Sequence, residues 1–550
     1  MNSNTQVKSP LEMAYHWEQE TPKKVFLRQA QDGEWLEYTW VEVMDAVRRL
    51  CSFIVSKNYE PGSRIGIWSA NSKDWVITDL AIMLSGHISV PIYPGQDIKS
   101  ANYILQHSET QLLFVGVFDM AEQFAKVETQ RIETVAMHGA SVDCATSITD
   151  ILANNSTYPP YTESPVPNHE DTFTIIYTSG TTGNPKGVMH KHITPGYVVP
   201  NIAKAFEMLD GDTKLFSFLP MAHAAERILI ELGSLYCNAS ISLSGGLETF
   251  AEEMRSVQPS FFFAVPRLWI KFKEGVDAKI PPEHQASLSA EQKKAIATQL
   301  GLGSANYILT GSAPCPVDVQ DWFTDKGIIL RDGYGMTENF IHGIAWTKDD
   351  APKSGCVGQP MNDDVEFKLS DEGEIMFHSK GLMKGYYKEP EKTAEVLVDG
   401  WYKTGDSGRI DEDGDLWVTG RISETFKTSK GKFVVPTKIE KRLGGINQLA
   451  QYCVVGHGLT APILLATLSE SGQLLDHDVL KEQLRNELNQ VNETLNPWEC
   501  LGGIVVVPEW TIENGLLTPT MKLRRQAIEA RHLASVQIER LSEEPIQLNV

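Results

Sequence analysis

The stretch YTSGTTGNPKGVMHKH, residues 177–192, decides how this chain is interpreted. It continues the apolar run TFTIIYT (172–178), which predicts a buried strand, and its glycines tolerate backbone angles that other residues avoid. Converging backbone N–H groups, hydroxyl side chains and a lysine together suit a bound anion. The residues concerned are Thr178, Ser179, Gly180, Thr181, Thr182, Gly183 and Lys186. The stretch therefore predicts a phosphate-binding loop.

This loop differs from the P-loop of ATPases and GTPases, which ends in Gly-Lys-Ser or Gly-Lys-Thr. Here Lys186 follows Pro185 and precedes Gly187. The spacing therefore disfavours a nucleotide-hydrolysing switch. A plain surface turn remains the alternative for the loop taken by itself, so other parts of the chain have to decide.

Length and composition indicate a folded protein of more than one domain. The chain has 550 residues, 42% of them hydrophobic and 22% charged. Its formal net charge of -22 disfavours general binding to nucleic acid or to anionic membranes. An anionic ligand would therefore need a locally basic site.

Cysteine usage and the apolar segments indicate the cell compartment. The seven cysteines are far apart and form no CxxC pair, which predicts neither a disulfide framework nor a zinc ribbon. The N-terminus lacks a signal sequence, and the longest apolar stretch, residues 76–94, contains Asp79 and His87. We expect a cytoplasmic protein without an integral membrane segment.

The order of apolar runs predicts an α/β fold for the N-terminal two-thirds. Short apolar runs alternate with helical patterns over residues 64–117, a βαβαβ arrangement, and similar runs return between residues 172 and 335. Strands that are apolar on both faces belong to parallel sheets covered by helices. We therefore expect helix-covered, mostly parallel sheets in this part.

The pattern changes toward the C-terminus. After Gly358 short strands and tight turns, such as RIDEDGDLWVTGR (409–421), predict a β-rich module. From residue 422 the chain has the pattern of a small α+β unit, whose clearest amphipathic helix is VLKEQLRNELNQVNETL (479–495). The sequence thus predicts two domains, residues 1–421 and 422–550.

Four further motifs accompany the phosphate loop in a fixed order. They are DGYGMTEN (332–339), WYKTGD (401–406), GRISETFKTSKGKFVVPTKIE (420–440) and LTPTMKLRR (517–525). With these motifs the chain resembles, over nearly its whole length, the adenylate-forming superfamily of acyl-CoA synthetases, luciferases and peptide-synthetase adenylation domains. FLPMAHAAER (218–227) is similar to the corresponding segment of fatty acid ligases.

The resemblance implies a reaction and its cofactors. A carboxylate attacks the α-phosphorus of ATP and expels pyrophosphate, and the thiol of CoA then attacks the acyl adenylate. ATP, Mg²⁺ and CoA are the implied cofactors, and a medium- or long-chain fatty acid is the implied substrate. The large domain would bind ATP and the acyl substrate, and the small mobile domain would carry the catalytic lysine.

The same resemblance implies roles for individual residues. Lys522 would bridge the attacking carboxylate and the α-phosphate, Glu338 would bind Mg²⁺, and His223 would lie at the mouth of the acyl tunnel with Thr178 as a further catalytic residue. A carboxylate suits Mg²⁺, which prefers oxygen ligands. Tyr334 would lie against adenine and Asp406 would accept hydrogen bonds from ribose. The remaining implied nucleotide-binding residues are Gly311, Ser312, Ala313, Asp332, Gly333, Gly335, Met336, Thr337 and Arg421.

Two positions depart from the family pattern. Ser423 stands at the implied hinge, where Asp or Lys is usual, and Lys430 replaces a glycine in the hairpin that would bind CoA through Lys430, Gly431 and Lys432. Lys430 would either contact a phosphate of CoA or lie exposed to solvent. We also expect an ion pair between Glu226 and Arg227. The run SFFFAVPRLW (260–269) is either a wall of the acyl tunnel or ordinary core.

Two rival functions remain. The acyl group could pass to a carrier protein instead of CoA, or the chain could be a non-catalytic sensor of nucleotide or acyl-CoA. The joint presence of Glu338, Asp406, Arg421 and Lys522 favours catalysis, because a sensor needs no site for a transition state. We expect small-molecule partners and no nucleic acid, while a homodimer and peripheral membrane contact are both compatible with the sequence.

Overall fold

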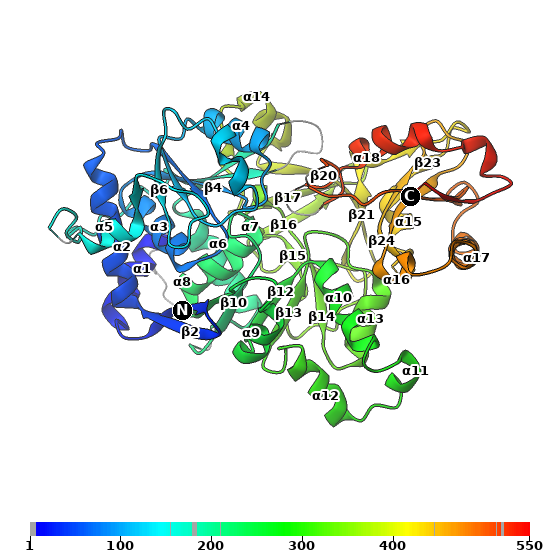
Figure 1. Cartoon of the computed structure of the whole chain (residues 1–550), viewed down its shortest axis with the longest axis horizontal. Helices are drawn as coiled ribbons and strands as arrows, with labels where there is room; N and C mark the ends of the chain where they lie inside the picture. Colours follow the sequence, from blue (N-terminus) through cyan, green and yellow to red (C-terminus); the bar gives the residue numbers. More distant parts are fainter. Residues whose placement is uncertain are drawn as a thin grey trace.

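The computed structural model describes residues 7–154, 156–178, 184–209, 211–444, 446–512, 514–518 and 522–549. Figure 1 shows a large body made by the blue to yellow part of the chain and a smaller orange and red part beside it. The predicted mixed α/β fold with a large N-terminal and a smaller C-terminal domain is confirmed.

The largest sheet has the strand order β18-β9-β8-β4-β3-β5-β6-β7 in the described part of the chain. The strands from β8 to β7 run parallel, and β9 and β18 continue the sheet antiparallel. The predicted βαβαβ arrangement is confirmed here, with α3 (Lys73–Leu84) and α4 (Ile98–Ser108) as its helices. The strands are β3 (Arg64–Trp68), β4 (Ile88–Ile92), β5 (Leu112–Val115), β6 (Glu133–Ala136), β7 (Thr146–Ser147), β8 (Thr172–Thr178), β9 (Lys186–Lys191) and β18 (Gly385–Tyr386).

Two four-stranded sheets complete the α/β part. One has the order β12-β13-β14-β15, with β12 to β14 parallel, and the other has the order β10-β11-β1-β2. Their strands are β1 (Val25–Gln31), β2 (Glu34–Thr39), β10 (Lys214–Ser217), β11 (Ser240–Leu243), β12 (Phe261–Ala264), β13 (Tyr307–Thr310), β14 (Leu330–Tyr334) and β15 (Ile344–Ala345). The hairpin β1–β2 is absent from the sequence-based prediction.

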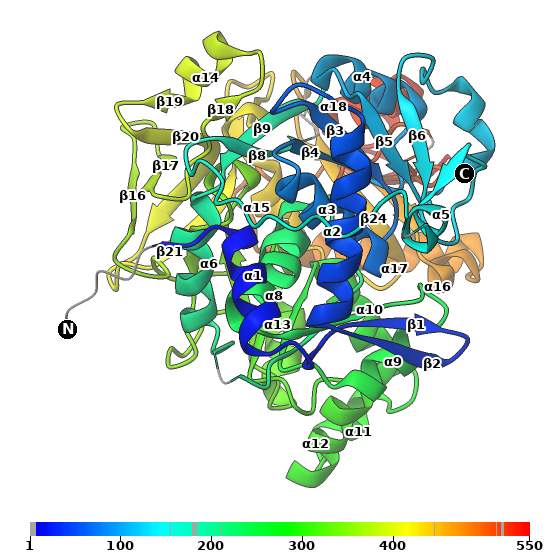
Figure 2. The ribbon, with the colours of Figure 1, turned by 90° about the vertical axis from the view of Figure 1, so that its left-hand side faces the viewer.

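Helices cover these sheets, as Figure 2 shows for α2 and α3 beside the strands of the largest sheet, with α1 below them in front of α8. The helices of the large body, besides α3 and α4, are α1 (Pro10–Glu20), α2 (Trp40–Ser56), α5 (Ile148–Ala153), α6 (Thr194–Ala205), α7 (Ala224–Glu226), α8 (Gly233–Cys237), α9 (Phe250–Val257), α10 (Pro266–Asp277), α11 (Pro282–Gln285), α12 (Ala290–Gln299), α13 (Val317–Asp325) and α14 (Pro390–Val396). No described helix is long and apolar enough to cross a membrane.

The β-rich module after Gly358 is confirmed as an antiparallel sheet with the order β16-β17-β20-β19, to which β21 is added along β20. Its strands are β16 (Val365–Leu369), β17 (Glu374–Ser379), β19 (Leu397–Val398), β20 (Trp401–Ile410) and β21 (Leu416–Arg421). The tight turn of DEDGD joins β20 to β21, as its turn chemistry predicts.

The C-terminal part has its own sheet, β24-β25-β26-β27, and two core clusters built from residues 426–546. The predicted amphipathic helix is α17, which buries Leu480, Leu484, Leu488 and Val491. The elements are β22 (Phe426–Lys427), β23 (Phe433–Val434), α15 (Pro436–Glu440), β24 (Leu449–Val455), β25 (Ile463–Leu468), α16 (Glu470–Gln473), α17 (His477–Glu493), β26 (Ile504–Val506), α18 (Arg525–His532) and β27 (Ile546–Leu548). These separate cores support a domain boundary near Arg421, which stays a prediction.

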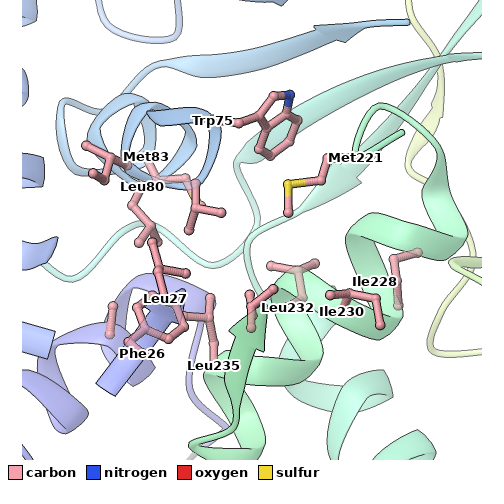
Figure 3. Packing of buried hydrophobic residues seen from close by; sticks show 14 of the residues in the cluster. Phe26, Leu27, Trp75, Leu80, Met83, Met221, Ile228, Ile230, Leu232 and Leu235 are labelled. Atoms are coloured by element: carbon pink, nitrogen blue, oxygen red, sulfur yellow. The ribbon is translucent and has the colours of Figure 1, made fainter. Parts of the chain in front are cut away.

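Helix α3 lies in the middle of the large core. All its residues from Asp74 to Leu84 are buried, in keeping with a helix that is apolar around most of its surface. Figure 3 shows Trp75, Leu80 and Met83 of α3 beside Phe26 and Leu27 of β1 and the segment that follows α7. That segment, Arg227–Leu232, is a π-helix, a rare form that is frequent at functional sites.

Arg227 begins the π-helix with a fully buried guanidinium. Its Nη2 donates to both carboxylate oxygens of Asp79 on α3 at 2.7 and 2.6 Å, and its Nη1 donates to Oγ1 of Thr174 on β8 at 2.5 Å. Its Nε lies 3.4 Å from Oε2 of Glu231. The network thus joins the π-helix to α3 and to the strand that leads into the phosphate loop.

The predicted ion pair between Glu226 and Arg227 is wrong. Glu226 instead accepts a hydrogen bond at 3.0 Å from the backbone N–H of Phe218, and burial raises its pKa to about 8. The physical reason is that consecutive residues of a helix do not face each other. Glu226 and Arg227 therefore form their hydrogen bonds with different elements.

We predict that Arg227→Met destabilises the protein by about 3–5 kcal/mol, because it leaves the Asp79 carboxylate buried without its cation. Urea unfolding of the large domain measures this loss. Lys273→Met, which breaks a partly exposed pair with Asp277 on α10, is the control and should cost less than about 1 kcal/mol. The double variant Arg227→Met/Asp79→Leu should recover part of the loss, and additive losses would contradict the charge argument.

Candidate active site

The phosphate loop is framed by two paired strands. Thr178 is the last residue of β8 and Lys186 is the first of β9, and these two residues are partners in the antiparallel register. Ser179, Gly180, Thr181, Thr182 and Gly183 lie outside the described residues. The two strands thus bring Thr178 and Lys186 opposite each other on either side of this segment, and their role in phosphate binding stays a prediction.

The predicted nucleotide motifs lie side by side at the ends of β13 and β14. Thr310 of β13 is in register with Asp332 of β14, so that Gly311, Ser312 and Ala313 follow β13 where Gly333 and Tyr334 end β14. A Cβ at Gly311 would lie 3.0 Å from the Gly333 carbonyl oxygen. Two backbones therefore approach closely here because glycine has no side chain.

The turn that follows β14 has little room for side chains as well. A Cβ at Gly335 would come within 2.9 Å of the backbone of Ile341, so only glycine fits without a shift. The backbone N–H of Met336 donates to Oδ1 of Asn339 at 2.9 Å, and Nε2 of His190 on β9 donates to the Thr337 carbonyl at 2.8 Å. His190 is a positioning residue that the sequence-based prediction missed.

Tyr334, Asp406 and Arg421 form one group. The Tyr334 hydroxyl donates to Oδ2 of Asp406 at 2.7 Å, and Nε of Arg421 lies 3.2 Å from Oδ1 of the same carboxylate. Asp406 and Arg421 are cross-strand partners on β20 and β21, which fixes their proximity. The structure thus brings the predicted adenine and ribose residues together.

Glu338 follows the same turn and points toward a tyrosine. The Tyr386 hydroxyl, from β18, donates to Oε1 of Glu338 at 2.9 Å, and the Lys186 amine lies 4.9 Å from the Tyr386 ring centroid. Tyr386 therefore links the phosphate-loop lysine to the predicted metal ligand. The sequence offered no signal for it, because it lies 48 residues from Glu338.

The donor set at Glu338 fits Mg²⁺. Such an ion usually takes one or two carboxylates and completes its shell with substrate phosphates and water. Among the described residues, the one group of three clustered carboxylates, Asp411, Asp413 and Asp415, lies elsewhere and surrounds the Lys353 amine at 3.0, 2.6 and 2.6 Å. That group serves an internal cation, so Glu338 remains the candidate ligand.

Lys522, from the C-terminal part, reaches this site. Its backbone N–H donates to Oγ1 of Thr518 at 3.0 Å, which closes a tight loop whose residues 519–521 lie outside the described range. The side chain remains accessible to water, but desolvation by the surrounding protein and repulsion from Arg421 lower its pKa, while Asp406 and Glu338 raise it. Lys522 of the small domain is thus close enough to both predicted carboxylates for them to raise its pKa.

His223 is also close enough to Lys522 for its pKa to be affected. Its Nδ1 accepts a hydrogen bond at 3.1 Å from the backbone N–H of Ala225, so it caps α7 and leaves its Nε2–H free to donate. Burial, with a further contribution from Lys522, lowers its pKa to about 3. His223 is therefore a neutral imidazole near neutral pH.

Asp332 meets a lysine that the sequence-based prediction did not include. Burial raises the pKa of Asp332 to about 7, and Lys441 at the end of α15 opposes that rise. Burial in turn lowers the pKa of Lys441, whose amine donates to the Val418 carbonyl of β21 at 2.8 Å. The nucleotide motif and the start of the C-terminal part are thus in electrostatic contact.

The predicted CoA residues lie apart from the nucleotide group. Lys430, Gly431 and Lys432 form the turn between β22 and β23, and the Lys432 amine lies 5.5 Å from the Trp498 ring centroid. Ser423 lies in a single helical turn directly after β21, where the chain leaves the large body. The predicted roles in CoA binding and hinge motion stay predictions.

The aromatic run around residues 260–269 packs on both of its faces. Phe261 stacks on Phe206 at a centroid distance of 5.7 Å, while Phe262 stacks on Phe218 at 5.6 Å. These contacts agree with the interpretation of residues 260–269 as part of the hydrophobic core. That they form a wall of an acyl tunnel stays a prediction.

The arrangement can stabilise crowded negative charge. Three cations come from separate elements: the Lys186 amine lies against the Tyr386 ring, Arg421 lies 3.2 Å from Asp406, and Lys522 is close enough to Asp406 and Glu338 for them to raise its pKa. Cations and donors that are already in place stabilise charge that develops in a transition state without reorganisation. The geometry therefore suits reactions at a phosphate group.

Comparisons with known proteins agree with this chemistry. A family model described as AMP-binding enzyme matches residues 14–387. The long-chain-fatty-acid–CoA ligase FadD15 of Mycobacterium bovis is 25% identical over 96% of this chain and 96% of its own length. The long-chain-fatty-acid–CoA ligase 5 of Rattus norvegicus is 28% identical over 93% of this chain and 85% of its own length.

Solved structures share the fold. The anthranilate CoA ligase AuaEII in complex with anthranoyl-AMP has a TM-score of 0.78 at 20% identity, covering 96% of this chain and 98% of that one. The adenylation domain of a carboxylate reductase from Mycobacterium chelonae has a TM-score of 0.79 at 21% identity, covering 97% and 91%. The resemblance inferred from the motifs is confirmed, and the chain belongs to the AMP-binding enzyme family.

Proposed function

We propose that this protein is an AMP-forming acyl-CoA synthetase. It activates a fatty acid with ATP to give an acyl adenylate and pyrophosphate, and then transfers the acyl group to CoA with release of AMP. One observation supports this proposal: Arg421, Asp406 and Glu338 of the large domain are close enough to Lys522 of the small domain to shift its pKa, and Lys522 in turn lowers the pKa of His223. Sites for nucleotide binding alone do not require a cation from a second domain.

The first half-reaction uses charge neutralisation. Thr178 and Lys186 hold the phosphates that depart as pyrophosphate, and Asp406 holds the ribose with Arg421. Lys522 lies between the incoming carboxylate and the α-phosphate, where its ammonium offsets the charge that builds up as the new P–O bond forms. Glu338 would hold Mg²⁺, which would supply further neutralisation of negative charge.

His223 orients the acid as a neutral donor. Because its Nδ1 is engaged by the N–H of Ala225, its Nε2–H is the group that can donate to a carboxylate oxygen. A neutral imidazole does not compete with Lys522 as a counter-ion, so the carboxylate keeps its nucleophilic character. His223 therefore acts as an orienting donor.

The second half-reaction requires the small domain to turn. Ser423 lies at the point where the chain leaves β21, and a rotation there would withdraw Lys522 and bring the turn of Lys430, Gly431 and Lys432 toward the adenylate. CoA carries several phosphates, for which Lys430 and Lys432 are suitable partners.

The fatty acid substrate class rests on two supports. The curated relatives named above are long-chain-fatty-acid–CoA ligases, and FLPMAHAAER is the segment similar to such ligases. Two alternative functions remain to be tested: transfer of the acyl group to a carrier protein, and a non-catalytic sensor of nucleotide or acyl-CoA. We also propose a cytoplasmic location, with acids and CoA as soluble partners.

A pyrophosphate-release screen tests the function. Saturated acids of increasing chain length are offered with ATP and Mg²⁺, with and without CoA, and acyl-CoA is detected by mass spectrometry. We expect release with medium- or long-chain acids and formation of the matching acyl-CoA. Release without thioester would favour a carrier-protein acceptor, and no release with any acid would favour a sensor.

We predict that Glu338→Gln abolishes Mg²⁺-dependent adenylation and leaves the fold intact, because one charge is removed where the ion should bind. Single-turnover pyrophosphate release measures the loss, and circular dichroism checks the fold. Tyr386→Phe is the matched control, since it removes only the hydroxyl that donates to Glu338 and should cause a smaller loss. Near-normal release by Glu338→Gln would refute the assignment.

We predict that Lys522→Ala slows adenylation by about a hundredfold or more, a typical cost of removing a preorganised stabiliser of charge. Supplied with ready-made acyl-AMP, the same variant should form acyl-CoA at close to the parent rate. Arg524→Ala, which loses a hydrogen bond to the Gly515 carbonyl at 3.1 Å, is the control and should keep both half-reactions. Failure of both half-reactions in folded Lys522→Ala would oppose the proposal that this lysine serves adenylation only.

A further inference from the structure

A second cation-rich site lies away from the nucleotide group, on the side of the large body where β14 begins. It is a cavity of about 570 Å³ formed by α12, the end of α13, the start of β14 and the segment after β15. Figure 1 shows α12 at the lower edge of the molecule, with α13 and β14 above it. A cavity of this volume has the size of a small-ligand site.

The charge of this cavity contrasts with the rest of the protein. Among the described residues, five cations and one carboxylate line it: Lys293, Lys294, Lys326, Arg331 and Lys348, with Asp325. The whole chain has a net charge of -22, so an anion is repelled by most of the surface. A local surplus of cations here is therefore an exception to the overall charge.

Neighbouring carboxylates neutralise only part of this charge. Lys293 and Lys326 share the single carboxylate of Asp325, at 3.1 and 2.7 Å. Lys348 pairs with Glu207, which lies outside the lining of this cavity. Lys294 is exposed and has no carboxylate within ion-pair distance in the described part of the chain.

Arg331 adds a buried charge that forms no ion pair with any carboxylate of the residues that the structure describes. Only 4% of its surface is exposed, and its guanidinium donates to the carbonyls of Thr347, Ile329 and Lys348 at 3.1, 3.4 and 2.9 Å. Carbonyls satisfy its N–H groups, but they do not cancel its charge. Because like charges are crowded around one cavity, an anion placed there relieves their repulsion.

We propose that this cavity binds a phosphate-bearing anion. Lysines supply charge-assisted hydrogen bonds to phosphate oxygens, while Leu302, Ile308 and Ile328 give the cavity an apolar floor that suits a ligand with a carbon skeleton. A soluble phosphate ester and the headgroup of an anionic lipid share this chemistry. The site is separate from the proposed catalytic residues and does not depend on the proposed function.

The test compares two double variants of the full chain that lose the same charge. Lys293→Gln/Lys294→Gln removes two cations of the cavity, and Lys271→Gln/Lys279→Gln removes two exposed lysines of α10 and its C-terminal end that do not line it. Calorimetric titration with inorganic phosphate counts the binding sites, and sedimentation with phosphatidylglycerol or phosphatidylcholine vesicles measures lipid binding. Pyrophosphate release should be unchanged in both variants.

We expect the cavity variant to lose one phosphate site, or to bind it at least about tenfold more weakly, while the control variant behaves as the parent. Loss of soluble phosphate binding identifies a soluble ester as the ligand. Loss of binding to phosphatidylglycerol vesicles alone identifies a lipid headgroup. Equal behaviour of the two variants with both probes would overturn the proposal.

Discussion

The buried guanidinium of Arg227 is the constraint on which the arrangement of the site depends. A charge inside the core is tolerated only when hydrogen bonds and an opposite charge surround it, and here Asp79 and Thr174 provide them. Burial raises the pKa of the nearby Glu231 well above its usual value, which keeps that third group neutral. The hydrogen bonds of Arg227 to Asp79 and Thr174 thus hold α3, β8 and the π-helix in one geometry.

This fixed geometry has consequences at both ends of the network. Thr174 lies four residues before Thr178 on the same strand, so the position of β8 determines where the phosphate loop begins. Arg227 lies four residues after His223, which caps the short helix α7 that leads into the π-helix. The buried ion pair of Arg227 and Asp79 therefore fixes the positions of both His223 and the start of the phosphate loop at Thr178, although these two residues are 45 positions apart in the sequence.

The sequence predicted the parts of the fold that carry a local pattern. Runs such as RIGIWS and TFTIIYT are apolar on both faces and can only be strands of a covered sheet, and α17 repeats its apolar residues at helical spacing. The hairpin β1–β2 was missed because β2, EWLEYT, is largely exposed and β1 pairs with β11, more than 200 residues away. Its pairing depends on tertiary contacts that no short window of sequence contains.

Among the site residues, motif matches assigned Tyr334, Asp406 and Arg421 to the nucleotide, and the structure brings these three side chains together, while their roles stay predictions. Tyr386 and Lys441 were missed, because each acts through a neighbour that is distant along the chain. The error at Glu226 has another origin: opposite charges adjacent in sequence suggested a pair, while helical geometry directs them to different sides. Spacing within a motif therefore predicts contacts only when the local backbone conformation is known.

The contacts between the small domain and β21 bear on the proposed rotation about Ser423. They are specific enough to fix one orientation of the small domain and weak enough to be broken and formed again. Two hydrogen bonds join α15 and the residue after it to β21: Thr437 Oγ1 donates to the Thr419 carbonyl at 2.9 Å, and the Lys441 amine donates to the Val418 carbonyl. Each such bond contributes only about 0.5–1.5 kcal/mol, so a rotation that breaks both meets a modest cost.

Lys441 also leaves Asp332 in that motion, and the buried carboxyl of Asp332, with its pKa raised to about 7, can then take up a proton instead of remaining an unpaired charge. In the proposed mechanism, a rotation that withdraws Lys522 would therefore also change the charge beside the nucleotide motif, because Lys441 lowers the pKa of Asp332 only while the two groups are close.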